Sequence, residues 1–240
     1  MTVSEMDTRL SQLLNDTNGR RWTQDDHRLP ALNDAQDWVV ATLLGILGKE
    51  SFSLLNSIQG HKQISVPTTG YAISTLGDDP GELFSEDGFI RAYVMVNGEK
   101  KRCVRLTPDK EGLQQNWYLK GCNSYPIIRF EIGNIYIDVD DGNYPVTTDI
   151  YYIRDPKELV VSSASGYQVT TCELDVGLHN VVVKASEAFC RRMADDFDQA
   201  NIILSSVYED IKIIARTPQR SVKSGIIGQW LNKQEDKRDA

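Results

Sequence analysis

The spacing of apolar residues changes twice along this chain of 240 residues. They recur at helical intervals over residues 1–60, alternate with polar residues through much of 61–172, and return to helical intervals over 173–216. A period of 3.6 buries one side of a helix, whereas a period of two buries one face of a strand. The pattern predicts an α+β fold: N-terminal helices and one long C-terminal helix form a helical bundle, with an antiparallel β-meander inserted between them.

The N-terminal region contains two helical stripes. Met6, Leu10 and Leu13 predict a short first helix that ends at Asn18-Gly19. The second helix is predicted to begin at Thr23, a helix-capping residue, and to continue through a stripe that includes Leu32 and Val39.

The middle of the chain contains a strong hairpin signal. Phe89–Val96 alternates in polarity, and Asn97-Gly98 then favours a tight turn, because both central residues of a type I′ turn need positive φ. We expect Glu99–Leu106 to be the return strand. Further strands are predicted over Tyr125–Glu131, Ile135–Val139 and Val146–Ile153.

A single unbroken helix is predicted over Asp175–Arg216, on the order of 60 Å long at 1.5 Å per residue. Arg191, Arg192, Asp195 and Asp196 would lie on its solvated face, in i,i+4 pairs such as Arg192–Asp196. The alternative for these charges is a contact with a neighbouring subunit. Residues 217–240 are predicted to be an extended tail.

Composition argues against several function classes. The formal net charge is −8 and the pI is about 5.0, so a DNA-binding role would rest on local clusters such as Lys100-Lys101-Arg102. Cys103, Cys122, Cys172 and Cys190 lack zinc-ligand spacing and predict free, mostly buried thiols in a reducing cytosol. Neither a signal peptide nor a membrane-spanning stretch is recognisable, which predicts a soluble protein.

Catalytic and metal-binding motifs are weak. Asp138–Asn143 is rich in carboxylates, but Gly142 falls one position early for a calcium loop, which favours a β-turn over a metal site. His179 is expected to be packed or partly exposed rather than catalytic. We therefore predict no enzyme activity, no cofactor and no metal.

Three blocks carry a resemblance to a known family: Leu13-Leu14-Asn15-Asp16-Thr17, Arg21-Trp22-Thr23 and Leu32-Asn33-Asp34-Ala35-Gln36. They resemble the opening of the tailed-phage adaptor, or head-to-tail connector, family. Thr107–Leu113 and the Gly133–Val139 hairpin resemble the β insertion of its podovirus or crAss-like relatives. From the residues themselves, Trp22 can pack as a staple on the fourth helical position. The amides of Asn33 and Gln36, on the apolar face, need hydrogen-bond partners.

The resemblance implies a structural virion protein, assembled in the host bacterial cytoplasm and located at the head–tail junction. Its subunits would form a ring, of twelve copies by family implication, that binds the portal protein and the next tail or ring protein. DNA would pass through the channel without sequence-specific binding. Arg191, Arg192, Asp195 and Asp196 are the candidate subunit contacts.

The C-terminal tail contains a short apolar anchor, made by Ile226, Ile227, Trp230 and Leu231. Such a segment after a helix can dock into a groove as a short helix or an added strand. Because C-terminal arms reach the portal in the family that the chain resembles, the portal is the implied partner. A disordered, solubilising tail is the alternative.

Two other functions stay open. Another tail component, such as a tail-tube or tail-terminator subunit, would be favoured if a β-rich core held the oligomer interface. A small metal-dependent hydrolase is the more remote alternative, centred on Asp138 and Asp140.

Overall fold

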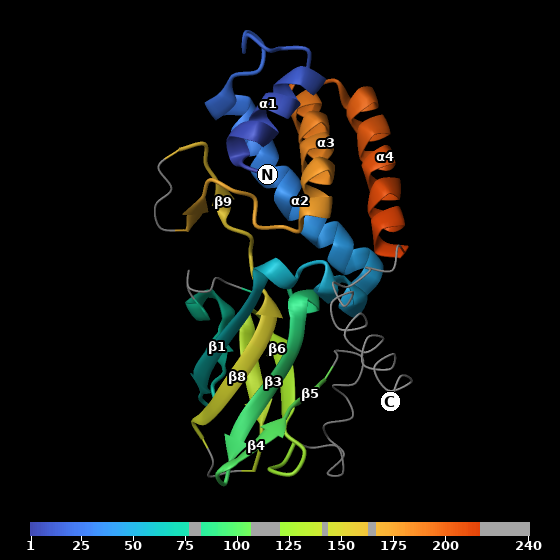
Figure 1. Cartoon of the computed structure of the whole chain (residues 1–240). Helices are drawn as coiled ribbons and strands as arrows, with labels where there is room; N and C mark the ends of the chain where they lie inside the picture. The colour runs from blue at the N-terminus through green and yellow to red at the C-terminus, as the bar shows by residue number, and fades with distance from the viewer. Residues whose placement is uncertain (77–82, 107–120, 141–143, 163–166, 217–240) are drawn as a thin grey trace, which may run out of the picture.

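The computed structural model describes residues 1–76, 83–106, 121–140, 144–162 and 167–216. Over these ranges the protein is mixed α+β, with a helical domain at one end and a β-sandwich at the other (Figure 1). The α-helices are α1 (Val3–Leu13), α2 (Leu29–Leu47), α3 (Val176–Met193) and α4 (Phe197–Arg216). A π-helical turn, η1 (Gln24–Arg28), runs directly into α2, and a 3-10 segment, η2 (Gly48–Ser53), follows it.

The sandwich consists of two four-stranded sheets with the orders β1-β8-β3-β4 and β2-β7-β6-β5. The first contains β1 (Gln59–Val66), β8 (Val146–Ile153), β3 (Phe89–Val96) and β4 (Glu99–Arg102). The second contains β2 (Tyr71–Ala72), β7 (Asn134–Asp138), β6 (Ile127–Glu131) and β5 (Val104–Arg105). A short parallel pair, β9 (Glu158–Leu159) and β10 (Gln168–Val169), lies beside the helical domain.

The antiparallel strands and the Asn97-Gly98 turn are confirmed, with φ of 54° and 79° at the turn residues, but the predicted meander order is wrong. β8 lies between β1 and β3, which are far from it in sequence. The predicted return strand also divides, because β4 stays with β3 while β5 crosses to the second sheet and pairs parallel to β6. Alternating polarity defines which face of a strand is buried, but it does not define the neighbouring strand.

The predicted single helix over Asp175–Arg216 is wrong as well. It is a hairpin of α3 and α4, which pack side by side (Figure 1). The chain reverses at Asp195, whose φ is +59°, and the backbone N–H groups of Asp195 and Asp196 donate to the carbonyls of Arg192 and Arg191. Both helices bury a stripe of the same period, so the apolar pattern continues across the turn and conceals it.

The helical domain and the sandwich have separate hydrophobic cores. Leu32, Val39 and Val182 belong to the helical core, whereas Val94 and Ile137 belong to the core between the two sheets. The chain enters the sandwich after α2 and returns to the helical domain at residues 153–155. There the buried Arg154 donates to the Glu173 carboxylate through Nη1 at 3.0 Å and Nη2 at 2.8 Å, which fixes the end of β8 against the segment that leads to α3.

Candidate functional site

The predicted subunit contacts lie at the α3–α4 turn. Arg191 bonds to the Glu187 carboxylate at 2.7 Å and reaches Asp196 at 3.4 Å, while Arg192 donates to Asn201 at 3.3 Å. The predicted Arg192–Asp196 pair is wrong, because α3 ends at Met193 and the two residues do not share a helix. Arg191 and Asp196 thus have partners within the chain, and Asp195 is the exposed αL residue of the turn.

Helix α4 has a solvent-facing apolar surface that the sequence pattern did not single out. Its buried stripe includes Ala200, Val207 and Ile211, which face α3. Away from this stripe Ile202 is 62% exposed and Ile213 is 63% exposed, and Ile213 also borders a pocket that Gly177 and Lys184 of α3 line. Eleven residues separate them, about three helical turns, so both project from one side. We call Ile202, Ser206, Glu209 and Ile213 the outer face of α4.

Figure 1 shows α4 at the edge of the helical domain, with α3 between it and α1. Helix α4 contacts α3 along its length and touches α2. An amphipathic helix normally keeps large apolar residues on its packed side. Ile202 and Ile213 are therefore two separate apolar side chains that stay exposed on this helix.

The amides of the Leu32–Gln36 block bind the backbone of strand β9. The Asn33 Oδ1 accepts from the backbone N–H of Leu159 at 2.8 Å, and its Nδ2 donates to the Leu159 carbonyl at 3.3 Å. The Gln36 Nε2 donates to the Lys157 carbonyl at 3.1 Å. The expected partners are thus found in the segment before α3, and the two amides dock β9 on α2.

The other resemblance blocks also have structural roles. The Asp16 carboxylate accepts hydrogen bonds from the backbone N–H groups of Arg20, Arg21 and Trp22 at 2.6–3.0 Å. These bonds lower the pKa of Asp16, and the bond from Trp22 has the largest effect. The Trp22 ring meets the His27 ring edge-on at 5.8 Å. Since His27 is the fourth residue after the Thr23 cap, the predicted staple contact is confirmed.

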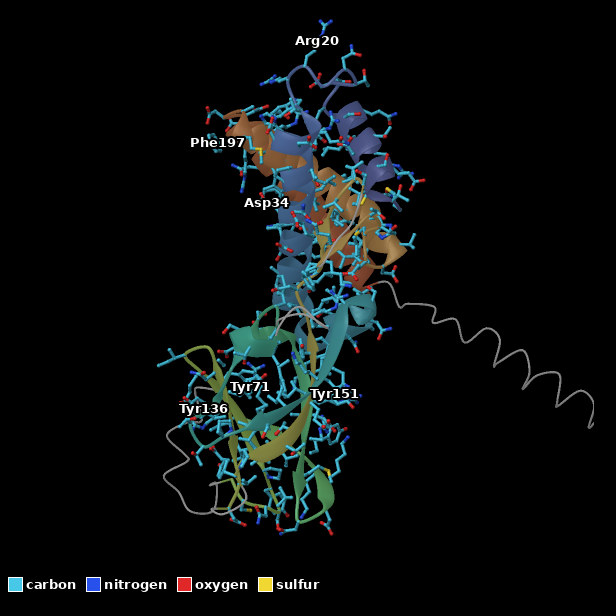
Figure 2. The ribbon with its side chains drawn as sticks, turned by 90° about the vertical axis from the view of Figure 1, so that its left-hand side faces the viewer. Arg20, Asp34, Tyr71, Tyr136, Tyr151 and Phe197 are labelled. Carbon is cyan, nitrogen blue, oxygen red and sulfur yellow. The ribbon has the colours of Figure 1, made fainter. Side chains whose placement is uncertain are left out.

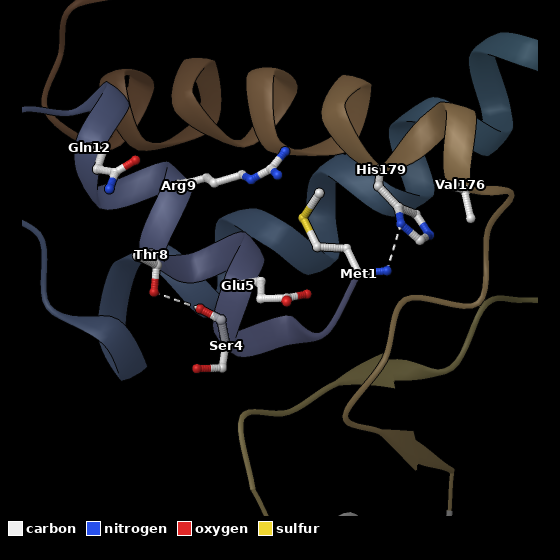
Figure 3. Close-up of a pocket in the computed structure, with 8 residues that line it drawn as sticks. All are labelled: Met1, Ser4, Glu5, Thr8, Arg9, Gln12, Val176 and His179. Atoms are coloured by element: carbon white, nitrogen blue, oxygen red, sulfur yellow. Dashed lines mark hydrogen bonds between the residues drawn. The ribbon is translucent and has the colours of Figure 1, made fainter.

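His179 is packed, as expected from the sequence. It is 3% exposed, its Nε2–H donates to the Leu174 carbonyl at 2.8 Å, and its Nδ1 accepts from the Met1 amino group at 2.9 Å. Burial lowers the pKa of the imidazole. Figure 3 shows this contact beside a pocket between α1 and the start of α3, into which Glu5 and Arg9 also point.

The four cysteines are free, and Cys103, Cys172 and Cys190 are buried, as predicted. Burial raises the pKa of their thiols to about 12, 11 and 12, respectively, so each stays protonated at neutral pH.

The carboxylate-rich segment is described only in part. Asp138 pairs with Arg129 at 3.2 Å, and the Asp140 carboxylate accepts from the backbone N–H of Asn123 at 3.2 Å. Residues 141–143 lie outside the described ranges, as does the predicted docking tail with Ile226, Ile227, Trp230 and Leu231. In the described part of the chain, no three His, Cys, Asp or Glu side chains gather as a metal site would require.

A basic pocket of about 480 Å³ lies where η2 meets strands β3, β4 and β5. Its lining includes Lys49, Arg91, Arg102 and Arg105, and it includes no acidic residue. Of these, only Arg102 belongs to the basic cluster Lys100-Lys101-Arg102 that is recognisable in the sequence. Arg102 and Arg105 are close in sequence, whereas the β3–β4 pairing brings Arg91 to them and the fold brings Lys49.

Helices in the described part of the chain do not combine the length and apolar character of a membrane span. In comparisons with known proteins, the chain matches no family model. A search of the curated proteins likewise finds no significant match.

Proposed function

We propose that the chain is a structural subunit of a tailed-phage virion, a head-to-tail adaptor that forms a ring on the portal and continues the DNA channel towards the tail. The observation that carries the proposal is the outer face of α4, where Ile202 and Ile213 project into solvent from an edge helix. The resemblance of the N-terminal blocks to the adaptor family supplies the identity of the assembly.

In a ring, each subunit presents two different surfaces to its two neighbours. The outer face of α4 would be one of these surfaces, meeting another part of the next copy. Burying Ile202 and Ile213 there would remove apolar area from water, which is the main favourable term in such contacts. The α3–α4 turn with Asp195 lies at one end of this helix and would border the contact.

The test is the assembly state of the full chain, with and without the portal protein of the same virus, by native mass spectrometry and electron-microscopic class averages. We expect the unmodified chain to form rings, and we expect Ile202→Glu and Ile213→Glu each to abolish them. Ile132→Glu is a matched control, because Ile132 is 99% exposed at the β6–β7 turn of the sandwich. Rings that survive both α4 substitutions would contradict this ring interface.

The tail is proposed to dock on the portal through Ile226, Ile227, Trp230 and Leu231. Deleting residues 217–240 should then abolish portal binding. Replacing only these four residues with serine should have the same effect, whereas replacing Lys233, Lys237 and Arg238 should have little. Portal binding that is unchanged by the deletion would refute the docking role.

The alternative, a tail-tube or tail-terminator subunit, has one observation in its favour. The sandwich has its own core and presents a large sheet surface, so it could hold the oligomer interface. The same experiment separates the two proposals. A stable free tube that is sensitive to Ile132→Glu, and insensitive to Ile202→Glu, would favour the alternative.

A further inference from the structure

The basic pocket at the junction of η2 with β3, β4 and β5 has an unusual charge balance for an acidic chain. Lys49, Arg91, Arg102 and Arg105 line it. Among the described residues, the only carboxylate within 4.0 Å of these cations is that of Glu86, 3.6 Å from Arg105. Lys49, Arg91 and Arg102 have no carboxylate at that distance in the described ranges. Positive charges held together without counter-charges attract an anion.

Aromatic rings position two of these arginines. The Arg91 guanidinium lies over the Tyr151 ring at 4.7 Å and the Tyr93 ring at 5.9 Å. That of Arg105 lies over the rings of Phe130 and Phe89, at 5.3 and 5.9 Å. An aromatic face orients a guanidinium without neutralising its charge. Both side chains are therefore held in place; the charge of Arg91 stays available to a ligand, whereas Arg105 also faces Glu86.

The register of the first sheet connects the pocket to an aromatic group on its outer face. Tyr151 pairs with His61 on one side and Arg91 on the other, and Tyr93 pairs with Arg102. The His61 ring stacks on Tyr151 with centroids 4.4 Å apart and planes 24° apart, and its side chain is half exposed. Figure 2 shows Tyr151 on the side of the sandwich opposite Tyr71 and Tyr136.

We propose that this surface binds a single-stranded nucleic acid without sequence preference, with phosphates in the basic pocket and an unpaired base stacked near His61. The planar guanidinium groups of Arg91 and Arg102 match the oxygens of a phosphate. Rings beside a basic groove supply the stacking surface that unpaired bases use. The proposal goes beyond the adaptor function and does not depend on ring formation.

The experiment measures binding of a fluorescein-labelled oligothymidylate of about fifteen nucleotides to the full chain by fluorescence anisotropy. The salt concentration is varied between about 50 and 200 mM. Each neutralised phosphate contributes about −0.7 to the slope of log K against log salt, so three uncompensated cations predict a slope of about −2. Arg91→Gln and Arg102→Gln should each make it about 0.7 less steep.

Three further variants make the result specific. Arg20→Gln is the matched control, because Arg20 lies at the far end of the helical domain (Figure 2), and its slope should equal that of the unmodified chain. Arg102→Lys keeps the charge and should keep the slope, which separates loss of charge from loss of structure. His61→Ala should weaken binding of the strand but leave the affinity for inorganic pyrophosphate unchanged.

Two outcomes would overturn the proposal. One is that Arg91→Gln and Arg102→Gln give the same slope of log K against log salt as Arg20→Gln. The other is displacement of the strand by poly-glutamate as efficiently as by unlabelled oligothymidylate, since that would mean attraction to any polyanion.

Discussion

Replacing Asn33 by alanine should destabilise the protein by about 2–3 kcal/mol. The Asn33 amide makes two bonds to the backbone of Leu159, one to its N–H at 2.8 Å and one to its carbonyl at 3.3 Å. On the other side of β9, the backbone N–H groups of Glu158 and Val160 donate to the carbonyls of Tyr167 and Val169, in and beside β10. Asn33 thus takes the place of a second strand on the open side of β9.

The magnitude follows from what alanine leaves behind. The lost bond to the carbonyl costs about 1 kcal/mol, and leaving the buried Leu159 N–H without its acceptor costs about 1–2 kcal/mol, which together give about 2–3 kcal/mol. Leu159 is 0% exposed, so water does not easily replace the amide there. Asn33→Asp keeps the acceptor for the Leu159 N–H but loses the donor to its carbonyl. Because a carboxylate oxygen would then face the Leu159 carbonyl, Asn33→Asp should also destabilise the protein, by at least about 1 kcal/mol.

The assay is urea denaturation followed by circular dichroism, combined with amide hydrogen exchange at Leu159. Asp34→Ala is the matched control, because Asp34 is the next residue of α2 and is exposed, so its effect should stay within about 0.5 kcal/mol. The reasoning fails if Asn33→Ala is as stable as Asp34→Ala, or if the Leu159 amide keeps its protection in Asn33→Ala.

Three further predictions concern charge and backbone. Asp7 and Arg28 form a buried ion pair at 2.7 Å. In urea denaturation, replacing either residue alone should lower the free energy of unfolding by about 3–5 kcal/mol, because it leaves a buried charge without a partner. The double variant Asp7→Leu with Arg28→Met should lose much less, and additive losses would contradict this. Burial, then Asp155 and Asp34, raise the pKa of Asp37 to about 6. Because that pKa lies above its unfolded value, stability should fall as pH rises from about 4 to 6. Asp37→Asn should flatten that part of the urea-denaturation profile. It should add less than about 1 kcal/mol at pH 7, since Asp37 is only partly buried and solvent screens its charge; an unchanged profile would refute this. At the α3–α4 turn, Asp195→Gly should remove the strain of a positive φ at a non-glycine residue and stabilise the protein by up to about 1 kcal/mol. The melting temperature should therefore rise, and a lower value would contradict the described turn.

The sequence predicts local structure well where a signal is confined to neighbouring residues. Alternation over Phe89–Val96 and the Asn97-Gly98 turn together specify a hairpin, and the structure contains it with the expected positive φ angles. Helix α2 follows the stripe through Leu32 and Val39, both of which are buried. In each case the interactions that decide the structure are separated by only a few residues.

The prediction fails where distant segments or a short turn decide the structure. The α3–α4 reversal depends on the αL conformation of Asp195, a residue type that tolerates it without requiring it. Helical spacing is the same on both sides of that turn. Similarly, the passage of Val104–Arg105 to the second sheet depends on its pairing with β6, which no local pattern encodes.

The candidate sites were only partly accessible from the sequence for the same reason. The triplet Lys100-Lys101-Arg102 indicated local positive charge, but Lys49 and Arg91 join Arg102 at the pocket through the fold alone. The sequence did place Ile202 and Ile213 outside the apolar stripe of α4, which includes Ala200, Val207 and Ile211, but their exposure depends on which neighbouring elements cover the helix.

The residues that carry the resemblance have structural roles in the described fold. Asp16 orders the loop before η1, Trp22 packs on His27, and Asn33 and Gln36 hold β9 on α2. Such contacts stabilise a layout that different assemblies could share, because a fold does not by itself define a function. Substitutions there should lower stability without selectively changing assembly. Substitutions on the outer face of α4 should abolish ring assembly and leave stability nearly unchanged. This contrast would distinguish an adaptor from a protein that has the same fold but does not form the ring.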